Sequence, residues 1–316
     1  MDKFDASQKI FDVEVFGEFG GVNPSIADSA TFTFMKAGTM IDTFHGESKG
    51  CFLYSRHWNP STKYLATALA EMEGTEDAWV TASGMGAITT TILQLCDTGD
   101  HIVSSRTTYG GTYAFLKNYL PKFNIDVTFV DITNLDEVKK AIKPNTKLIY
   151  TETMTNPLLE ISDIPNLSKI ADDNGIKLVV DNTFTPLIFS PARLGAHIVV
   201  YSLTKFINGT NDTVGGAICS SQEFINSMID VNNGSAMLLG PTMDSLRAAS
   251  ILKNLHTLHI RMKQHSKNAM ELAKRLRTIS LDVRYPGMPD HKQHDLMTEM
   301  MNEEFGYGGR RRADTC

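Results

Sequence analysis

The sequence has few cysteines, no long apolar run and no block of charge of one sign. Its four cysteines, Cys51, Cys96, Cys219 and Cys316, show neither metal-ligand spacing nor the pattern of a disulfide framework. We therefore expect reduced thiols and no metal site. No apolar run approaches the roughly 18 residues of a membrane span, and the first residues lack the apolar core of a signal peptide. These absences predict a cytoplasmic protein that does not bind membranes.

Charge is nearly balanced along the chain. The 30 Lys and Arg and 36 Asp and Glu give a formal net charge of −6, and no long basic block precedes the last few residues. Nucleic acids and anionic membranes are therefore not expected partners. What the chain does have is length and apolar content. With 316 residues, 42% of them hydrophobic, it can form one large domain and a smaller one.

Three regions follow one another along the chain. Residues 1–60 are rich in Gly, Phe and Thr without a sustained helical period, which is typical of an arm that packs on something larger. Residues 61–240 alternate apolar runs with amphipathic helices, and this alternation predicts a large α/β domain whose mostly parallel sheet is covered on both faces. The runs are 101–104, 127–130, 147–151, 177–181 and 197–201. Residues 241–316 predict a long connecting helix and a shortened C-terminal domain.

Two residues, Asp181 and Lys205, carry most of the functional prediction. Asp181 ends a predicted strand, and Lys205 follows the next one, where ligands bind in parallel α/β sheets. A carboxylate there can keep a pyridine nitrogen protonated, and a lysine can form a Schiff base with an aldehyde. The pair therefore predicts a pyridoxal phosphate (PLP) site. Taken singly, Asp181 could also be a helix or turn cap, and Lys205 a solvated lysine at a strand end.

Two glycine-containing segments precede predicted helices. Free backbone amides after Ser83, in the segment Ser83-Gly-Met-Gly, could bind a phosphate, with the hydroxyls of Ser202 and Thr204 beside it. A plain helix cap by Ser83 is the alternative. Tyr109, which precedes two glycines, could stack its ring on the cofactor. It could equally pack under a glycine turn.

Three further polar residues lie outside these segments. Tyr54 and Arg56 belong to the N-terminal arm, where an arginine could bind phosphate by crossing a subunit interface. The alternative is an ordinary surface loop. Asn156, which precedes a proline, could bond a ring hydroxyl of the cofactor, or it could simply form a turn.

Together these residues resemble the Cys/Met metabolism family of PLP-dependent enzymes. This family includes cystathionine γ-synthases and γ-lyases, methionine γ-lyases and O-acylhomoserine sulfhydrylases. The resemblance covers roughly residues 20–280. Its motifs here are Tyr54-Ser-Arg-x-x-Asn-Pro, Ala82-Ser-Gly-Met-Gly-Ala, Tyr109-Gly-Gly-Thr, Glu152-Thr-Met-Thr-Asn-Pro, Val180-Asp-Asn-Thr-Phe, Ser202-Leu-Thr-Lys and Thr257-Leu-x-x-Arg-Met.

The resemblance implies a fold-type-I PLP enzyme, with a mostly parallel sheet of the seven-stranded type between helices. It implies that Lys205 forms the Schiff base and that Asp181 bonds the pyridine nitrogen. It also implies a homodimer or homotetramer with sites shared between subunits. The residues implied to hold the phosphate are Gly84, Met85, Ser202 and Thr204, joined by Tyr54 and Arg56 from a neighbouring subunit.

The implied activity is γ-elimination or γ-replacement on a homoserine ester, cystathionine or methionine. Lys205 would move protons between carbons, and Tyr109 would activate the incoming amine or protonate the leaving group. Similar methionine γ-lyases typically have cysteine at the position of Gly111, whereas synthases and sulfhydrylases have glycine there, as this chain does. O-acylhomoserine sulfhydrylase is therefore an alternative.

A second alternative is a shortened homologue that binds PLP without turnover. The arginine that binds the substrate carboxylate in the family lies in a part of the second domain without a counterpart here, and residues 310–312 lie outside the family's context. Aminotransferase activity is less favoured, because the arm motif and the Tyr109 motif match the sulfur enzymes. A nucleotide-binding oxidoreductase is least favoured, since no Gly-x-Gly-x-x-Gly follows a first strand.

Overall fold

A seven-stranded sheet forms the centre of the protein. The computed structural model describes residues 4–12, 20–44, 48, 50–309 and 312–314. The strand order is β1-β7-β6-β5-β4-β2-β3; β7 runs antiparallel to both neighbours, and the remaining pairs are parallel. The strands are β1 (Asp77–Thr81), β2 (His101–Ser105), β3 (Asp126–Val130), β4 (Thr146–Glu152), β5 (Lys177–Asp181), β6 (Ile198–Ser202) and β7 (Gly216–Ser220). This confirms the predicted α/β class and the mostly parallel sheet.

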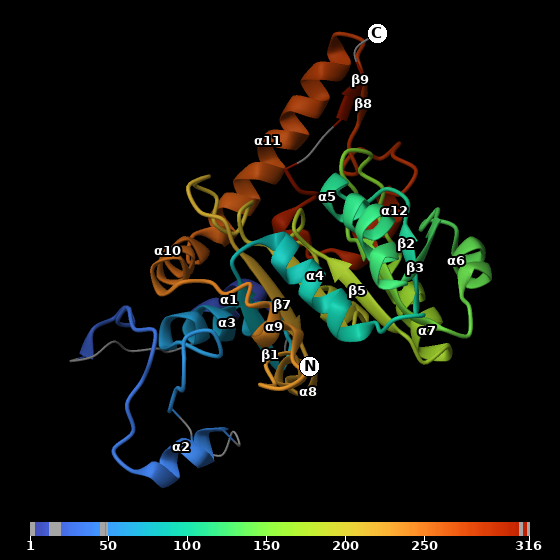
Figure 1. Ribbon diagram of the computed structural model, residues 1–316. Helices are drawn as coiled ribbons and strands as arrows, with labels where there is room; N and C mark the ends of the chain where they lie inside the picture. The colour runs from blue at the N-terminus through green and yellow to red at the C-terminus, as the bar shows by residue number, and fades with distance from the viewer. Residues whose placement is uncertain (1–3, 13–19, 45–47, 49, 310–311, 315–316) are drawn as a thin grey trace.

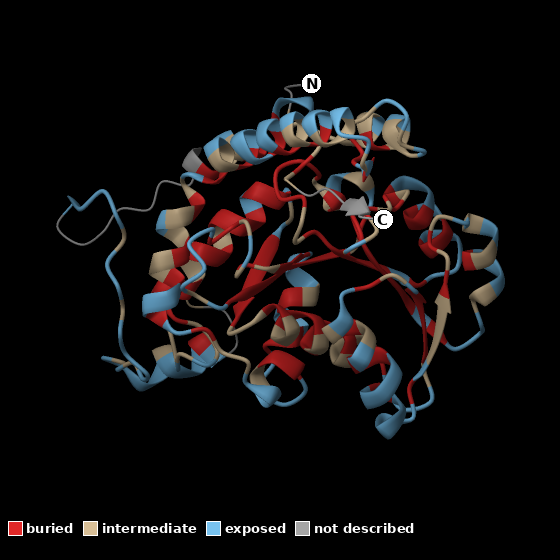
Figure 2. Ribbon diagram, turned by 90° about the horizontal axis from the view of Figure 1, so that it is seen from above, coloured by how far each residue is buried: buried red, intermediate tan, exposed pale blue. Residues whose placement is uncertain are grey.

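The strands are apolar throughout because both faces of the sheet are covered. Alternate side chains enter two different cores: Leu178 and Val180 pack on one face of the sheet, and Val179 packs on the other. Figure 2 shows the buried sheet between layers of helices. Strand β7 is not among the runs predicted from the sequence, because its five residues begin with glycine and give only a weak β signal.

Helices flank the sheet on both sides (Figure 1). The α-helices of the main body are α3 (Pro60–Glu73), α4 (Gly84–Leu95), α5 (Gly110–Ala114), α6 (Leu135–Ala141), α7 (Ile164–Asp173), α8 (Gln222–Met228), α9 (Ser235–Leu239) and α10 (Ser245–Leu255). Shorter helical segments are η2 (Phe115–Tyr119), η3 (Leu120–Phe123), η4 (Pro191–Leu194) and η5 (Glu303–Phe305). Leu65, Leu69 and Met72 of α3 recur at helical spacing, so they share one face of the helix, and all three are fully buried.

The N-terminal region differs in its two parts. Helix α1 (Ala6–Asp12) packs on the body, with Ala6 and Ile10 in the same core as α3. Residues 32–44, including α2 (Ala37–Phe44), extend away from the body in Figure 1, whereas Ala27 and Asp28 are hydrogen-bonded to Asn59, Ser61 and Ser245 of the body. Apolar side chains of this segment are exposed, Met35 fully and Phe44 by 53%. The division into arm, large domain and C-terminal part stays a prediction.

Two consecutive helices, not one, connect to the C-terminal part. Helix α10 ends at Leu255, and α11 (Leu258–Thr278) begins after Thr257. An antiparallel pair, β8 (Asp282–Arg284) and β9 (Arg312–Asp314), lies beside α11, and α12 (His294–Met300) follows β8. Gln293 bonds both backbone polar groups of Ile161, at 3.0 and 2.6 Å, which joins this part to the main body. Arg310 and Arg311 lie outside the described residues.

Candidate active site

A cavity of about 390 Å³ opens where β4, β5 and β6 end and α4 begins. This is the edge at which parallel α/β sheets bind ligands. The cavity is lined by Ser83, Gly84, Met85, Ile88, Tyr109, Glu152, Asn156, Asp181, Thr183, Phe184, Ser202, Thr204, Lys205 and Val214. Nine of the eleven residues predicted from the sequence are in this set. The exceptions are Tyr54 and Arg56.

Asp181 is held rigidly at the end of β5. Its Oδ1 accepts hydrogen bonds from the backbone and the hydroxyl of Thr183, the first of them at 2.9 Å. Its Oδ2 accepts one longer bond, 3.4 Å, from the Tyr150 hydroxyl. Burial raises the pKa of Asp181, and the Thr183 and Tyr150 bonds oppose that rise. A cation placed beside Oδ2 would favour the ionised carboxylate.

Lys205 lies in the turn after β6 and points its side chain into the cavity lining. The residue is exposed, and its amine forms no hydrogen bond or ion pair with any described residue. A lysine without an anionic partner has its amine free for a covalent bond. Its ammonium form is not neutralised by a nearby carboxylate.

The N-terminus of α4 lies against the end of β6. Ser83 is the N-cap, since its hydroxyl accepts a bond from the Gly86 amide at 3.0 Å, so the capping interpretation holds for that side chain. A Cβ at Gly84 would lie 2.6 Å from the Cβ of Ser202, so only glycine permits this approach. The first-turn amides and the Ser202 hydroxyl, which has no described partner, form an anion-binding concavity.

Tyr109 and Asn156 border the same cavity from two loops. Tyr109 is the residue directly before α5 and is half exposed. A Cβ at Gly111 would lie 2.6 Å from the Tyr109 ring, so glycine leaves room for the ring's present position. Asn156 follows β4 by four residues.

Five lining residues were missed by sequence reasoning: Ile88, Glu152, Thr183, Phe184 and Val214. Glu152 gave a usable signal, because it directly follows the predicted run 147–151, close to the strand end at which Asp181 was predicted to bind the cofactor. Thr183 follows Asp181 by two residues, the spacing of an Asx turn. The three apolar residues gave none, because their chain segments are brought together only by the fold.

Tyr54 and Arg56 lie away from this cavity in their own chain. Arg56 donates to the backbone oxygen of Met237 at 2.8 Å and lies over the Tyr54 ring, 5.6 Å from its centroid. Both residues are exposed. One chain therefore does not bring them to Lys205.

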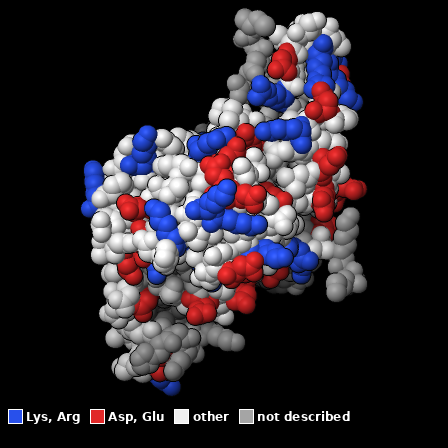
Figure 3. Space-filling model, turned by 90° about the vertical axis from the view of Figure 1, so that its right-hand side faces the viewer, with Lys and Arg blue, Asp and Glu red and all other residues white. Residues whose placement is uncertain are grey.

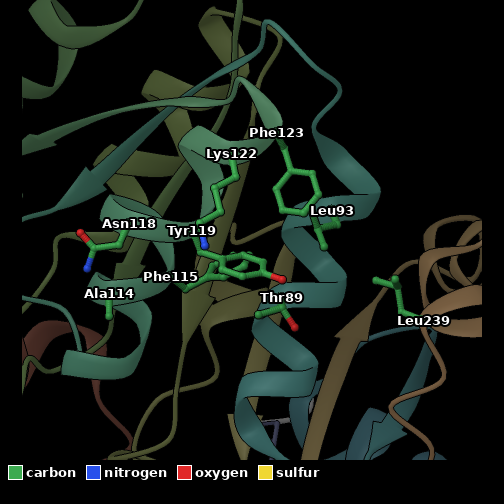
Figure 4. A pocket seen from close by; sticks show the side chains of 9 residues that line it. All are labelled: Thr89, Leu93, Ala114, Phe115, Asn118, Tyr119, Lys122, Phe123 and Leu239. Carbon is green, nitrogen blue, oxygen red and sulfur yellow. The ribbon is translucent and has the colours of Figure 1, made fainter.

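An apolar groove of about 620 Å³ lies next to the cavity and is lined by Thr89, Leu93, Ala114, Phe115, Asn118, Tyr119, Lys122, Phe123 and Leu239. Figure 4 shows the rings of Tyr119 and Phe123 beside α4, with Leu239 across from them. Tyr119, Phe123 and Leu239 are 48, 45 and 59% exposed. Helix α4 joins the two sites, because its first turns line the cavity and its later turns line the groove.

Metal sites and membrane-spanning helices were also sought in the part of the chain that the structure describes. There, no cluster of three or more His, Cys, Asp or Glu is arranged to hold a metal, and no helix is long and apolar enough to cross a membrane. Figure 3 shows basic and acidic side chains interspersed on the face it presents.

Known proteins resemble this chain over nearly all of its length. The model of the family described as Cys/Met metabolism PLP-dependent enzyme matches residues 12–307. A methionine gamma-lyase of Arabidopsis thaliana is 46% identical over 93% of this chain and 68% of its own. An L-methionine gamma-lyase of Fusobacterium nucleatum is 40% identical, over 91% and 73%. A solved structure, a putative O-acetylhomoserine (thiol)-lyase of Campylobacter jejuni with N'-pyridoxyl-lysine-5'-monophosphate, matches with a TM-score of 0.89, 26% identity and coverage of 97% and 84%.

Proposed function

Because the chain belongs to the Cys/Met metabolism family of PLP-dependent enzymes, we propose that its cavity removes the γ-substituent of L-methionine or a related amino acid. The family resemblance read from the sequence, and with it PLP as cofactor, is confirmed. The observation that carries the proposal is the meeting of Asp181, Lys205 and the start of α4 in one cavity.

The cavity residues fit PLP. The anion-binding concavity at Gly84 suits the phosphate, the buried Asp181 suits a protonated ring nitrogen, and the Lys205 amine has no competing partner. When bound, PLP withdraws electrons from the α-carbon of an amino acid and so eases the loss of its proton.

Each residue then has a task that its position supports. Lys205 would provide the amine for the covalent link to the cofactor and would move a proton between substrate carbons. Asp181, fixed by Thr183, would keep the ring nitrogen protonated. The Tyr109 hydroxyl would protonate the departing sulfur. Asn156 would hold the ring hydroxyl, and Ser202 and Thr204 would hold the phosphate.

γ-Replacement with a thiol is the second candidate. Gly111 favours it, because similar methionine γ-lyases typically have cysteine at this position, whereas synthases and sulfhydrylases have glycine. The likeness to the Campylobacter jejuni structure points the same way. Elimination uses water and releases the γ-substituent, a keto acid and ammonia, whereas replacement forms a thioether with the incoming thiol and releases only the γ-substituent.

The test is the visible spectrum of the purified protein with PLP, followed during addition of L-methionine or O-acetylhomoserine, with and without a thiol. We expect cofactor absorbance that changes with substrate, and keto acid from methionine. Lys205→Ala should abolish both, whereas Lys177→Ala, at the far end of β5 from Asp181, should change neither. Keto acid at the wild-type rate from Lys205→Ala would refute the proposal. Absorbance without any response to an amino acid would favour a homologue that binds PLP without turnover.

We also propose that two copies of the chain form a dimer through the apolar groove beside α4 and share their active sites. The aromatic rings exposed in this groove would be buried by the second copy, and α4 lines both the groove and the cavity. Tyr54 and Arg56 would then reach the partner's phosphate. Mixing inactive Arg56→Ala with inactive Lys205→Ala should restore about a quarter of the activity, because random pairing leaves one intact site in each hybrid dimer. No recovery after confirmed subunit exchange would contradict shared sites. The dimer or tetramer and the cytoplasmic location stay predictions.

A further inference from the structure

Glu152 is a buried acid in the cavity for which the proposed chemistry has no task. It ends β4 and is the register partner of Asp181 on β5, so the two carboxyl groups lie on the same face of adjacent strands. Only 4% of Glu152 is exposed. No described cation pairs with it, although Lys205 lines the same cavity.

The two oxygens of Glu152 differ in their contacts. Oε1 accepts a hydrogen bond from the Tyr109 backbone amide, at 2.5 Å. The backbone amide of Asn156 also donates to this carboxyl group. Oε2 is buried without a hydrogen-bond partner among the described residues. One side chain therefore ties together the loops after β2 and after β4, both of which border the cavity.

Two adjacent buried carboxyl groups do not both ionise readily. Burial and the neighbouring Asp181 raise the pKa of Glu152 to about 8. Asp181 accepts two bonds from Thr183 and one from Tyr150, whereas Glu152 has backbone amides only. With a positive ring nitrogen beside it, Asp181 is the group that ionises.

We propose that Glu152 is a positioning residue that acts as an uncharged carboxyl group, holding the backbone of Tyr109 and Asn156 and leaving Asp181 as the single negative charge among the described cavity residues. This inference rests on the proposed function. It assigns Glu152 no proton transfer with the substrate.

The distinguishing variant is Glu152→Gln, because glutamine keeps the accepting oxygen and the neutral state. We expect its kcat and KM to stay within about threefold of wild type from pH 6 to 7. Between pH 7 and 9 the variant should keep this activity, whereas wild type should lose activity as Glu152 ionises. Glu152→Leu removes the acceptor and should lower kcat roughly 10- to 100-fold. Glu160→Gln is the matched control, since Glu160 is partly exposed beside Lys292, 3.5 Å away, and does not line the cavity.

Infrared spectroscopy of the protein without PLP gives a readout independent of turnover. At pH 7, the wild-type minus Glu152→Gln difference should contain the C=O band of a protonated carboxyl group. The control difference for Glu160→Gln should contain carboxylate bands instead. A carboxylate band for Glu152, or a loss of kcat above about 100-fold in a Glu152→Gln variant that still binds PLP, would overturn the proposal. Failure of the proposed function would appear differently, as a wild-type protein whose spectrum ignores every amino acid.

Discussion

Replacing Glu73 by glutamine should remove much of the pH dependence of stability. Glu73 is the last residue of α3 and is 1% exposed. Its Oε1 accepts a bond from the Ala192 amide at 2.9 Å, and its Oε2 bonds the Tyr201 hydroxyl. No described cation accompanies it. Burial raises its pKa from 4.5 to about 8, against the effect of these two bonds.

The upward shift of this pKa decides whether Glu73 makes the protein more or less stable as the pH rises. Because the folded-state pKa of Glu73 exceeds the unfolded value, folding favours the protonated form. The stabilisation is fully present below about pH 4.5 and is lost as the pH rises toward 8. In that interval the free energy of unfolding falls by up to about 1.4 kcal/mol per pH unit from this group alone. Glutamine keeps the oxygen that accepts from the Ala192 amide, can donate from its amide nitrogen to the Tyr201 hydroxyl oxygen, and does not titrate.

The assay is urea unfolding of the PLP-free protein from pH 5 to 8.5, followed by the fluorescence of Trp58 and Trp79. Glu73→Gln should be within about 1 kcal/mol of wild type at pH 5 and clearly more stable at pH 8. Glu71→Gln is the matched control, since Glu71 lies on the same helix with a 47% exposed side chain. Parallel wild-type and Glu73→Gln curves across this range would refute the reasoning, because they would mean that Glu73 has an ordinary pKa in the folded protein.

Three further changes test other contacts. Gly84→Ala should weaken PLP affinity at least about tenfold, because the new Cβ would lie 2.6 Å from Ser202. An absorbance titration with PLP measures this affinity. Gly110→Ala is the control, because a Cβ at Gly110 meets nothing within 4 Å. Arg261→Lys should cost about 1–3 kcal/mol in urea unfolding, because one ammonium cannot replace the bonds to three backbone oxygens; unchanged stability would contradict this. Leu239→Glu should shift the protein toward monomer in sedimentation, and an unaffected oligomer would exclude the groove as the interface.

The sheet and most of the cavity could be predicted because their signals are local. A buried parallel strand shows as an apolar run, and its last residue marks the ligand edge, as with Asp181. The helix start at Ser83 shows in the glycine that follows it. These positions need no knowledge of distant contacts.

The missed residues depend on contacts between segments that are far apart in the sequence. Phe184 and Val214 reach the cavity only because β5 and the segment before β7 lie near the same sheet edge. Arg56 shows the opposite case. Its sequence motif predicted a phosphate ligand, but within its own chain its side chain bonds the backbone oxygen of Met237 and not the cavity. The break between α10 and α11 was missed because the apolar period continues across it from Leu255 to Leu258.

Glu73 and Glu152, the two buried acids, both contact residues near the end of β5, where Asp181 lies. Glu73 bonds Tyr201, whose hydroxyl accepts a bond from the Asn182 amide at 2.9 Å, and Asn182 directly follows Asp181. Glu152 is the register partner of Asp181 across the strand pair. A neutral Glu73 holds the backbone after Asp181, and a neutral Glu152 leaves Asp181 free to carry the charge. Raising the pH far enough to ionise both acids should therefore destabilise the fold and the cavity together, because each new charge would be buried without a described cation.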